Sequence, residues 1–215
     1  MKFIICDVET IAHEDAASWQ EPIKPAANLK DPAKVAASIA ERTAERDEKL
    51  GLDPDCNRIV ALGYVVVGSN DPVCLICRDE AEEAAALTQF WAEYAAPVGQ
   101  QETRLVTYFG HGFDAPVLMR RSLLLSVKYP ALNIDRYRSP HLDLCHILSF
   151  NGALKPKSLK FYAKRFGLTT LDKVDGADVA KLAAAGDWDA IRDHCLSDIG
   201  LTHALANKLG LLRMS

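Results

Sequence analysis

Lys2-Phe3-Ile4-Ile5-Cys6-Asp7-Val8-Glu9 is an apolar run that ends in two carboxylates. Such a run is typical of a buried central strand whose C-terminal tip reaches a functional site. Residues i and i+2 of a strand leave the same face, so Asp7 and Glu9 can bind one divalent cation together. The alternative is a pair of solvated surface charges, but two like charges that close an apolar strand are costly unless a metal neutralises them.

Beyond this strand, the hydrophobic pattern predicts strands first and helices later. The strands are expected at 58–68 and 72–78, joined as a hairpin, and at 104–109. Helices are expected at 79–94, 113–127, 158–166, 175–185 and 188–209. This order favours an α/β fold in which a mixed β-sheet is flanked by helices.

The segment 11–54 differs in composition, being rich in Ala, Glu, Lys, Arg and Pro. Asp31-Pro32 has the pattern of an N-cap and first turn, and predicts a helix through about Leu50. We interpret 11–54 as a helical surface insertion. With 215 residues, 49% of them hydrophobic, the chain 1–215 suits one large domain.

Composition also limits the possible partners and compartments. The net charge of −4 and the pI near 5.9 give no global positive field, so a nucleic acid would need a local basic surface. The sequence has no apolar stretch approaching 18 residues and no export-type start, which predicts a cytoplasmic protein without a membrane partner.

The cysteines favour reduced, buried thiols over a disulfide framework. They stand in apolar surroundings at Cys6, Cys56, Cys74, Cys77, Cys145 and Cys195. The pair Cys74 and Cys77 falls in a predicted strand, where positions i and i+3 point to opposite faces, so the two sulfurs are poorly placed for one zinc ion.

Two further segments carry acidic residues in suggestive places. Gly110-His111-Gly112-Phe113-Asp114 is a glycine-bracketed turn between a predicted strand and a predicted helix, although Asp114 could simply charge the first helical turn. On the last helix, His194 and Asp198 are i and i+4 and share a face, whereas Asp193 lies about 140° from Asp198. The alternative for this helix is a solvated face.

Taken together, these segments resemble the three motifs of the DEDD exonuclease superfamily, whose fold is RNase H-like. A more specific resemblance is to the bacterial and phage family of predicted 3'→5' exonucleases related to the exonuclease domain of family B DNA polymerases. It rests on Gly112-Phe113-Asp114-Ala115-Pro116-Val117-Leu118, His141-Leu142-Asp143-Leu144, Lys173-Val174-Asp175-Gly176 and His194-Cys195-Leu196-Ser197-Asp198-Ile199. It covers 2–10 and about 56–206.

The resemblance implies a 3'→5' exonuclease that hydrolyses single-stranded DNA by a two-metal-ion mechanism. The four carboxylates that hold two Mg²⁺ or Mn²⁺ ions would be Asp7, Glu9, Asp114 and Asp198. Asp7 would bridge the ions, Glu9 would also contact the terminal hydroxyl, and His194 would orient and deprotonate the attacking water. Thr10, His111 and Phe113 are expected to contact the nucleic acid.

Two positions depart from the family pattern. The polymerase-related subclass usually has tyrosine four residues before the last aspartate, where this chain has His194; the other main subclass has histidine five residues before it, where this chain has Asp193. Phe109 stands where the second motif commonly has asparagine. These departures keep open the alternative of a catalytically weakened nucleic-acid-binding module. A second alternative is an exoribonuclease or oligonucleotidase, since neither the carboxylates nor the basic residues distinguish the sugar.

A single strand also needs a positive track and stacking partners. The densest basic stretch interleaves aromatic residues and comprises Lys155, Lys157, Lys160, Phe161, Tyr162, Lys164 and Arg165. Arg120 and Arg121, on the helix after Asp114, are further candidates. We expect Lys157, Lys160 and Lys164 to bind nucleic acid, DNA rather than RNA; the alternative is that the aromatics are core and the lysines a solvated face.

Overall fold

A five-stranded mixed sheet in the order β3-β2-β1-β4-β5 forms the centre of the molecule. The computed structural model describes residues 1–69, 71–96, 102–135, 137–168, 172 and 174–212. The central strand β1 (Lys2–Ala12) pairs antiparallel with β2 (Asn57–Val66) and parallel with β4 (Thr103–Thr107). The outer strands are β3 (Val73–Ile76) and β5 (Leu142–Asp143). The predicted mixed sheet and hairpin are confirmed.

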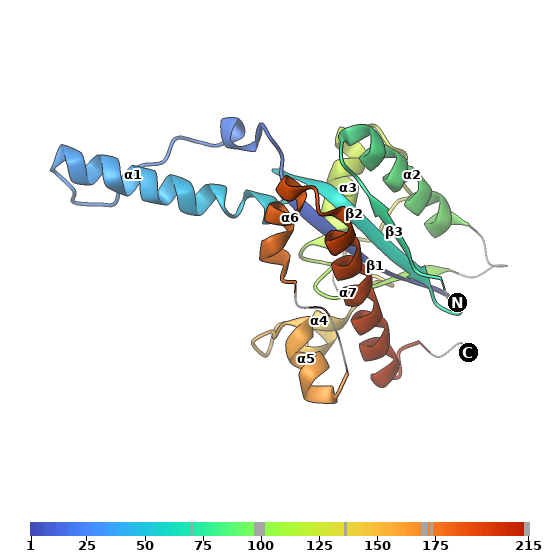
Figure 1. Cartoon of the computed structure of the whole chain (residues 1–215). Helices are drawn as coiled ribbons and strands as arrows, with labels where there is room; N and C mark the ends of the chain where they lie inside the picture. Colours follow the sequence, from blue (N-terminus) through green and yellow to red (C-terminus); the bar gives the residue numbers. More distant parts are fainter. Residues whose placement is uncertain (70, 97–101, 136, 169–171, 173, 213–215) are drawn as a thin grey trace.

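Helices cover both faces of this sheet, as Figure 1 shows. One face packs on α2 (Glu80–Ala95) and α3 (Asp114–Leu124). The other packs on α4 (Leu144–Leu148), α5 (Leu159–Phe166), α6 (Val179–Ala185) and α7 (Trp188–Lys208). The predicted caps of α5 are confirmed, because Ser158 accepts from the amide of Phe161 and Gly167 adopts a left-handed φ of 68°. Neither β5 nor α4 was predicted from the sequence.

The alternation of β1 decides where its carboxylates point. Ile4, Cys6 and Val8 are buried in the core under α2 and α3. Phe3 and Ile5 are buried in the opposite core, against α7. Since side chains alternate along a strand, Asp7 and Glu9 face the side that α7 crosses.

Gly63 allows α7 to lie close to the sheet beside Asp7. Gly63 of β2 is paired in register with Asp7. A Cβ atom at Gly63 would lie 2.4 Å from Cδ1 of Ile199 and 2.5 Å from Sγ of Cys195. These distances are below van der Waals contact, so the absence of a side chain at this position sets the spacing between α7 and β1.

The predicted insertion contains the helix α1 (Pro32–Asp47), which projects from the body of the molecule in Figure 1. Its N-cap is Asp31, as predicted, and none of its own residues is buried. It ends three residues earlier than expected and is followed by the 3₁₀ turn η2 (Leu50–Leu52). The strand β1 runs to Ala12, two residues into the range assigned to the insertion. The 3₁₀ turn η1 (Ala16–Trp19) follows it.

The cysteines lie as the sequence predicts. Cys74 packs against the core under α7 and Cys77 lies in the core under α2, so the two do point to opposite faces. All six cysteines, which lie in the described part of the chain, are free thiols. No helix among the described residues is long and apolar enough to cross a membrane.

The expectation for Arg121 is wrong. Its side chain is only 2% exposed and binds Glu83 through Nε at 2.7 Å. A buried ion pair of this kind is structural, since neither charge reaches a ligand. Arg120 is more exposed and pairs with Asp55 at 2.7 Å.

Candidate active site

A cleft of about 480 Å³ opens at the C-terminal end of β1. Its walls come from β1, the loop after β4, α3, α5 and α7. The five predicted catalytic residues all line it: Asp7, Glu9, Asp114, His194 and Asp198. Residues separated by up to 191 positions in the sequence (7 and 198) therefore line one cleft.

The two carboxylates of β1 lie on one wall. Ligand oxygens of Asp7 and Glu9 lie within 4.8 Å of one another. The pairing of β1 with β2 shifts register between Glu9 and Thr10, and such bulges re-aim side chains near functional sites. The side chain of Glu9 is 9% exposed and approaches Nε2 of His194 at 3.5 Å.

Asp114 enters from the loop between β4 and α3. It is the first residue of α3 and is buried, where the helix N-terminus favours a negative charge. The loop is tightly built, since the amide of Gly110 donates to Oγ1 of Thr107 and Phe109 has a positive φ of 67°. A Cβ at Gly112 would lie 2.5 Å from the ring of Phe109, so this glycine makes room for the aromatic ring at the cleft.

The helix α7 supplies His194 and Asp198 on the face that the i, i+4 spacing predicted, while Asp193 is exposed. Nδ1 of His194 lies 2.7 Å from Oδ2 of Asp172. This bond fixes the ring so that its other nitrogen faces Glu9. Asp172 was missed by the sequence analysis, because its partner lies 22 residues away and no local pattern marks it.

The carboxylates of the cleft raise one another's pKa values. Burial raises the pKa of Asp7 well above its ordinary range, and Glu9, Asp114 and Asp198 add to the rise. Burial likewise raises the pKa of Glu9 and of Asp114 to about 7, and that of Asp198 rises for the same reason. Burial opposes the charge on His194, but Glu9, Asp172 and Asp198 together raise its pKa. Without a cation, the ionised cleft is therefore strongly self-repelling.

A family model matches most of the chain. Residues 52–214 match the family described as predicted 3'-5' exonucleases related to the exonuclease domain of PolB. The chain belongs to this family. It is thus a member of a nuclease family, as the motifs implied. No curated protein sequence matches the chain well enough to count as a relative.

A solved family B DNA polymerase shares the fold of this chain. A family B DNA polymerase from the hyperthermophilic archaeon Pyrobaculum calidifontis is similar over 97% of this chain and 24% of the polymerase, with 17% identity and a TM-score of 0.62. E. coli exonuclease I in complex with a dA16 oligonucleotide is similar over 99% of this chain and 46% of its own, with 16% identity and a TM-score of 0.46. The chain spans less than half of either protein. The polymerase match confirms the predicted RNase H-like exonuclease fold.

The side chains of the cleft fit the divalent ions expected for this nuclease family. Oδ1 of Asp198 is buried and has no hydrogen-bond partner among the described residues, which is costly unless another group satisfies it. The surrounding carboxylates offer hard oxygen ligands, which Mg²⁺ and Mn²⁺ prefer. Asp7, Glu9, Asp114 and Asp198 would hold such ions.

The residues expected to contact nucleic acid are divided between the cleft and its surroundings. Thr10, Phe113 and Lys160 line the cleft. Thr10 donates to the carbonyl of Gly51, and Lys160 pairs with Asp175 at 2.9 Å, so the charge of Lys160 is partly compensated. Lys157 and Lys164 are exposed on the surface near α5. Their role in binding stays a prediction.

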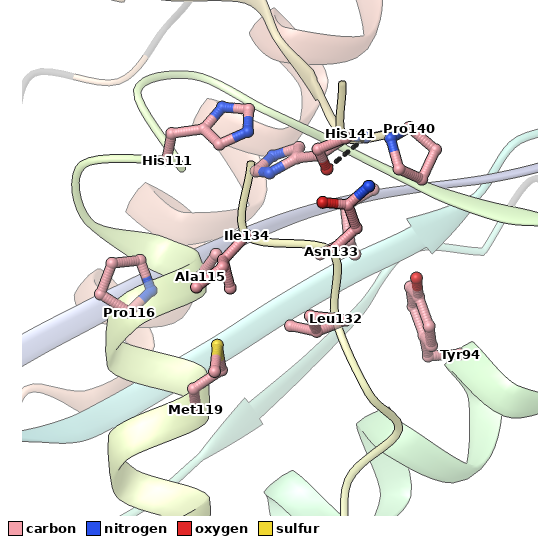
Figure 2. A pocket seen from close by; sticks show the side chains of 12 residues that line it. Tyr94, His111, Ala115, Pro116, Met119, Leu132, Asn133, Ile134, Pro140 and His141 are labelled. Atoms are coloured by element: carbon pink, nitrogen blue, oxygen red, sulfur yellow. Dashed lines mark hydrogen bonds between the residues drawn. The ribbon is translucent and has the colours of Figure 1, made fainter. Parts of the chain in front are cut away.

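His111 lies outside the cleft. It lines a separate apolar pocket of about 100 Å³ between α3 and the segments 132–134 and 139–141, where its ring stacks on that of His141 (Figure 2). The residues that line this pocket include no carboxylate. The pocket therefore lacks the acidic ligands that the cleft offers to divalent ions.

Proposed function

We propose that the chain is a metal-dependent 3'→5' exonuclease that removes nucleotides from the 3' end of single-stranded DNA. The observation that supports this proposal is the meeting of Asp7, Glu9, Asp114 and Asp198 in one cleft. Membership of a family of predicted 3'-5' exonucleases supports the 3'→5' direction of degradation. When bound, divalent ions would stabilise negative charge on the phosphate and lower the pKa of the attacking water.

The cleft also suits an unpaired strand end. Aromatic side chains of Tyr108, Phe109 and Phe113 line it, and Phe109 is 46% exposed. Unstacked bases bind to such rings whatever their sequence. In this proposal Phe109, which replaces the usual asparagine, serves as a stacking surface instead of a hydrogen-bonding group.

His194 is the group best placed to orient and accept a proton from the attacking water. Asp172 holds Nδ1, so Nε2 points to the cleft beside Glu9. An imidazole held in this way can act as a general base. The carboxylate of Asp172 would then stabilise the imidazolium that forms. Lys160, also in the cleft, would place a positive charge near the phosphate.

A degradation assay tests the proposal. Single-stranded DNA and RNA oligonucleotides carrying a 5' label are incubated with the protein and Mg²⁺, Mn²⁺ or chelator. We expect a ladder of shortened, still labelled DNA with metal and none with chelator. Faster loss of RNA would identify an exoribonuclease. Binding without cleavage under every metal condition would identify a nucleic-acid-binding module instead, and would overturn the proposal.

The role of His194 can be tested separately. We expect His194→Ala to lower turnover by about two to four orders of magnitude, the usual contribution of a general base. Affinity for Mn²⁺ should change little, because the four carboxylates stay in place. Asp193→Ala, one residue earlier and exposed, is the matched control. Wild-type turnover by His194→Ala would show that this imidazole does not activate the water.

A further inference from the structure

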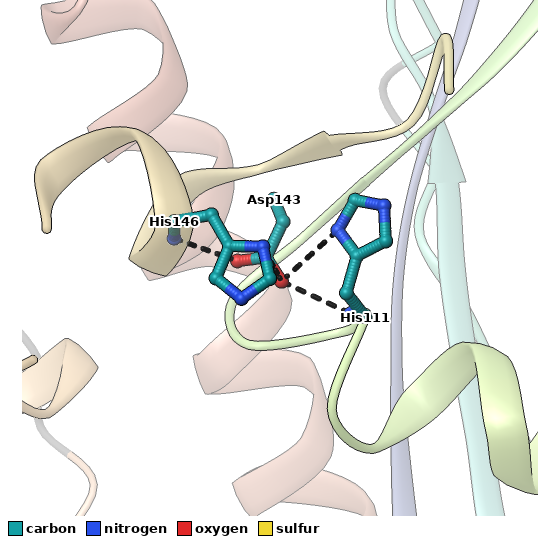
Figure 3. A group of neighbouring side chains, drawn as sticks. All are labelled: His111, Asp143 and His146. Atoms are coloured by element: carbon teal, nitrogen blue, oxygen red, sulfur yellow. Dashed lines mark hydrogen bonds and ion pairs between the residues drawn. The ribbon is translucent and has the colours of Figure 1, made fainter. Parts of the chain in front are cut away.

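A second cluster of metal-binding side chain types lies outside the catalytic cleft. It joins His111 from the loop after β4, Asp143 at the end of β5 and His146 in α4, which face one another in Figure 3. Nδ1 of His111 lies 3.4 Å from Oδ2 of Asp143. Nδ1 of His146 lies 3.6 Å from the same oxygen. The three candidate ligand atoms all lie within 4.8 Å of one another.

These distances suit a shared ion better than direct hydrogen bonds. A hydrogen bond between nitrogen and oxygen is about 2.7 to 3.2 Å long, so 3.4 and 3.6 Å are too long. In a tetrahedral site with metal–ligand distances of about 2.0 to 2.2 Å, neighbouring ligand atoms are about 3.3 to 3.6 Å apart. Both imidazole–carboxylate distances lie in the range expected between neighbouring ligand atoms of such a tetrahedral site.

The burial of His111 strengthens this indication. Both of its ring nitrogens are buried and neither meets hydrogen-bond geometry with any described residue. Leaving a buried imidazole nitrogen unsatisfied costs about 1 to 3 kcal/mol. An ion bound at Nδ1 would satisfy one of the two nitrogens.

The carboxylate of Asp143 is already oriented for this role. Its Oδ1 accepts from the amides of Phe109 and His146 at 3.0 and 3.1 Å. Its Oδ2 accepts from the amide of His111 at 3.0 Å and faces both imidazoles. Hydrogen bonds that fix a ligating carboxylate are typical of protein metal sites.

The site also has an entrance. A cavity of about 390 Å³ is lined by His111 and His146 together with Phe109, Gly112 and Ile134. It gives an ion access from solvent and leaves room for water as a fourth ligand.

We propose that His111, Asp143 and His146 bind one divalent transition-metal ion such as Zn²⁺, at a site separate from the carboxylate cleft. Imidazole ligands favour ions of this class, whereas the all-carboxylate cleft favours Mg²⁺ or Mn²⁺. The ion would tie the loop 109–112 to β5 and α4. Because this loop leads directly into Asp114, the ion would hold the second motif in place without touching substrate.

Zinc titration of the metal-free full-length protein tests this site, in competition with a chromophoric chelator. The titration uses an Asp198→Asn background, which weakens Zn²⁺ binding at the nearby Asp172, His194 and Asp198 group. We expect a tight Zn²⁺ equivalent in this background, additional to any ion held by Asp7 and Glu9. Adding His146→Ala should weaken that equivalent by at least about 100-fold, since even indirect partners of a ligand contribute 10- to 100-fold. Adding His203→Ala, on α7, should leave it unchanged.

Two further readouts separate metal binding from folding. Zn²⁺ should raise the melting temperature of the Asp198→Asn protein but not that of the double variant with His146→Ala. Co²⁺ should give the visible absorption of a tetrahedral complex, which His111→Ala should abolish. Equal Zn²⁺ affinity with and without His146, or no Zn²⁺ equivalent in the Asp198→Asn protein, would overturn the proposal and leave Asp143 as a hydrogen-bonded anchor of the loop.

Discussion

Replacing Asp114 by asparagine should make the metal-free protein more stable while removing its metal-dependent activity. Asp114 is 3% exposed, and burial, with Asp143 and Glu9 nearby, raises its pKa from 3.8 to about 7. The folded state therefore binds this proton more tightly than the unfolded state does. Stability that depends on the proton is present below pH 4 and is lost as the pH rises to about 7.

The size of the effect follows from the pKa values. A rise from 3.8 to about 7, at about 1.4 kcal/mol per pH unit, means that ionised Asp114 costs about 4 kcal/mol at pH 8. Asparagine keeps nearly the same shape without the charge. Because its amide must also lose water, the expected gain in unfolding free energy is about 2 to 4 kcal/mol.

Urea denaturation in chelator at pH 8 and pH 5 measures this gain. At pH 5, which lies between the unfolded and folded pKa values of Asp114, only about a third of this cost is present, so the gain should be about 2 to 3 kcal/mol smaller than at pH 8. Asp193→Asn, exposed on α7, should change stability at neither pH. A variant at Asp114 that is no more stable than wild type at pH 8, or that gains equally at both pH values, would refute the repulsion argument.

Three other predictions follow from the same structure. Gly63→Ala should push α7 off the sheet and lower nuclease activity at least about tenfold, since a shift of about 1 Å can cost 100-fold. Gly200→Ala on α7, with nothing within 4 Å of its Cβ position, should instead stabilise the protein by up to about 1 kcal/mol. Similar activities for the two variants would show that Gly63 does not set the spacing between α7 and the sheet. Arg121→Met should leave Glu83 buried without its partner and lower the unfolding free energy by about 3 to 5 kcal/mol. A loss under about 1 kcal/mol in urea denaturation would show that the two side chains do not form a buried ion pair. Mn²⁺ binds the deprotonated carboxylates, and the pKa values of Glu9 and Asp114 are about 7. The affinity for Mn²⁺ measured by calorimetry should therefore fall at least about tenfold from pH 8 to pH 6. An affinity that does not change with pH would show that these groups do not hold the ion.

Local patterns in the sequence predicted which candidate side chains share a face, whereas their assembly into one site was implied by the family resemblance. The apolar run before Asp7 predicted the central strand, and period 2 placed Asp7 and Glu9 on one face, where the structure has them lining the cleft. The i, i+4 spacing correctly paired His194 with Asp198 and excluded Asp193. These inferences succeeded because backbone geometry alone fixes which neighbouring residues share a face.

Contacts between distant elements could not be predicted in this way. Asp172 orients His194, which lies 22 residues further along the chain. Glu83 forms a buried ion pair with Arg121, which lies 38 residues away in the sequence. Gly63 matters only because α7 crosses it. The two-residue strand β5 is too short for any period to show. Each of these roles depends on a tertiary contact. The residue type alone therefore suggested a surface charge or gave no prediction.

The claim on which the rest depends is that four carboxylates hold cations together in one cleft. Anomalous diffraction from a crystal grown with Mn²⁺ and a short DNA oligonucleotide tests it most directly. We expect two manganese peaks about 4 Å apart, ligated by Asp7, Glu9, Asp114 and Asp198. Manganese bound elsewhere, with these four side chains left without an ion at saturating Mn²⁺, would contradict it.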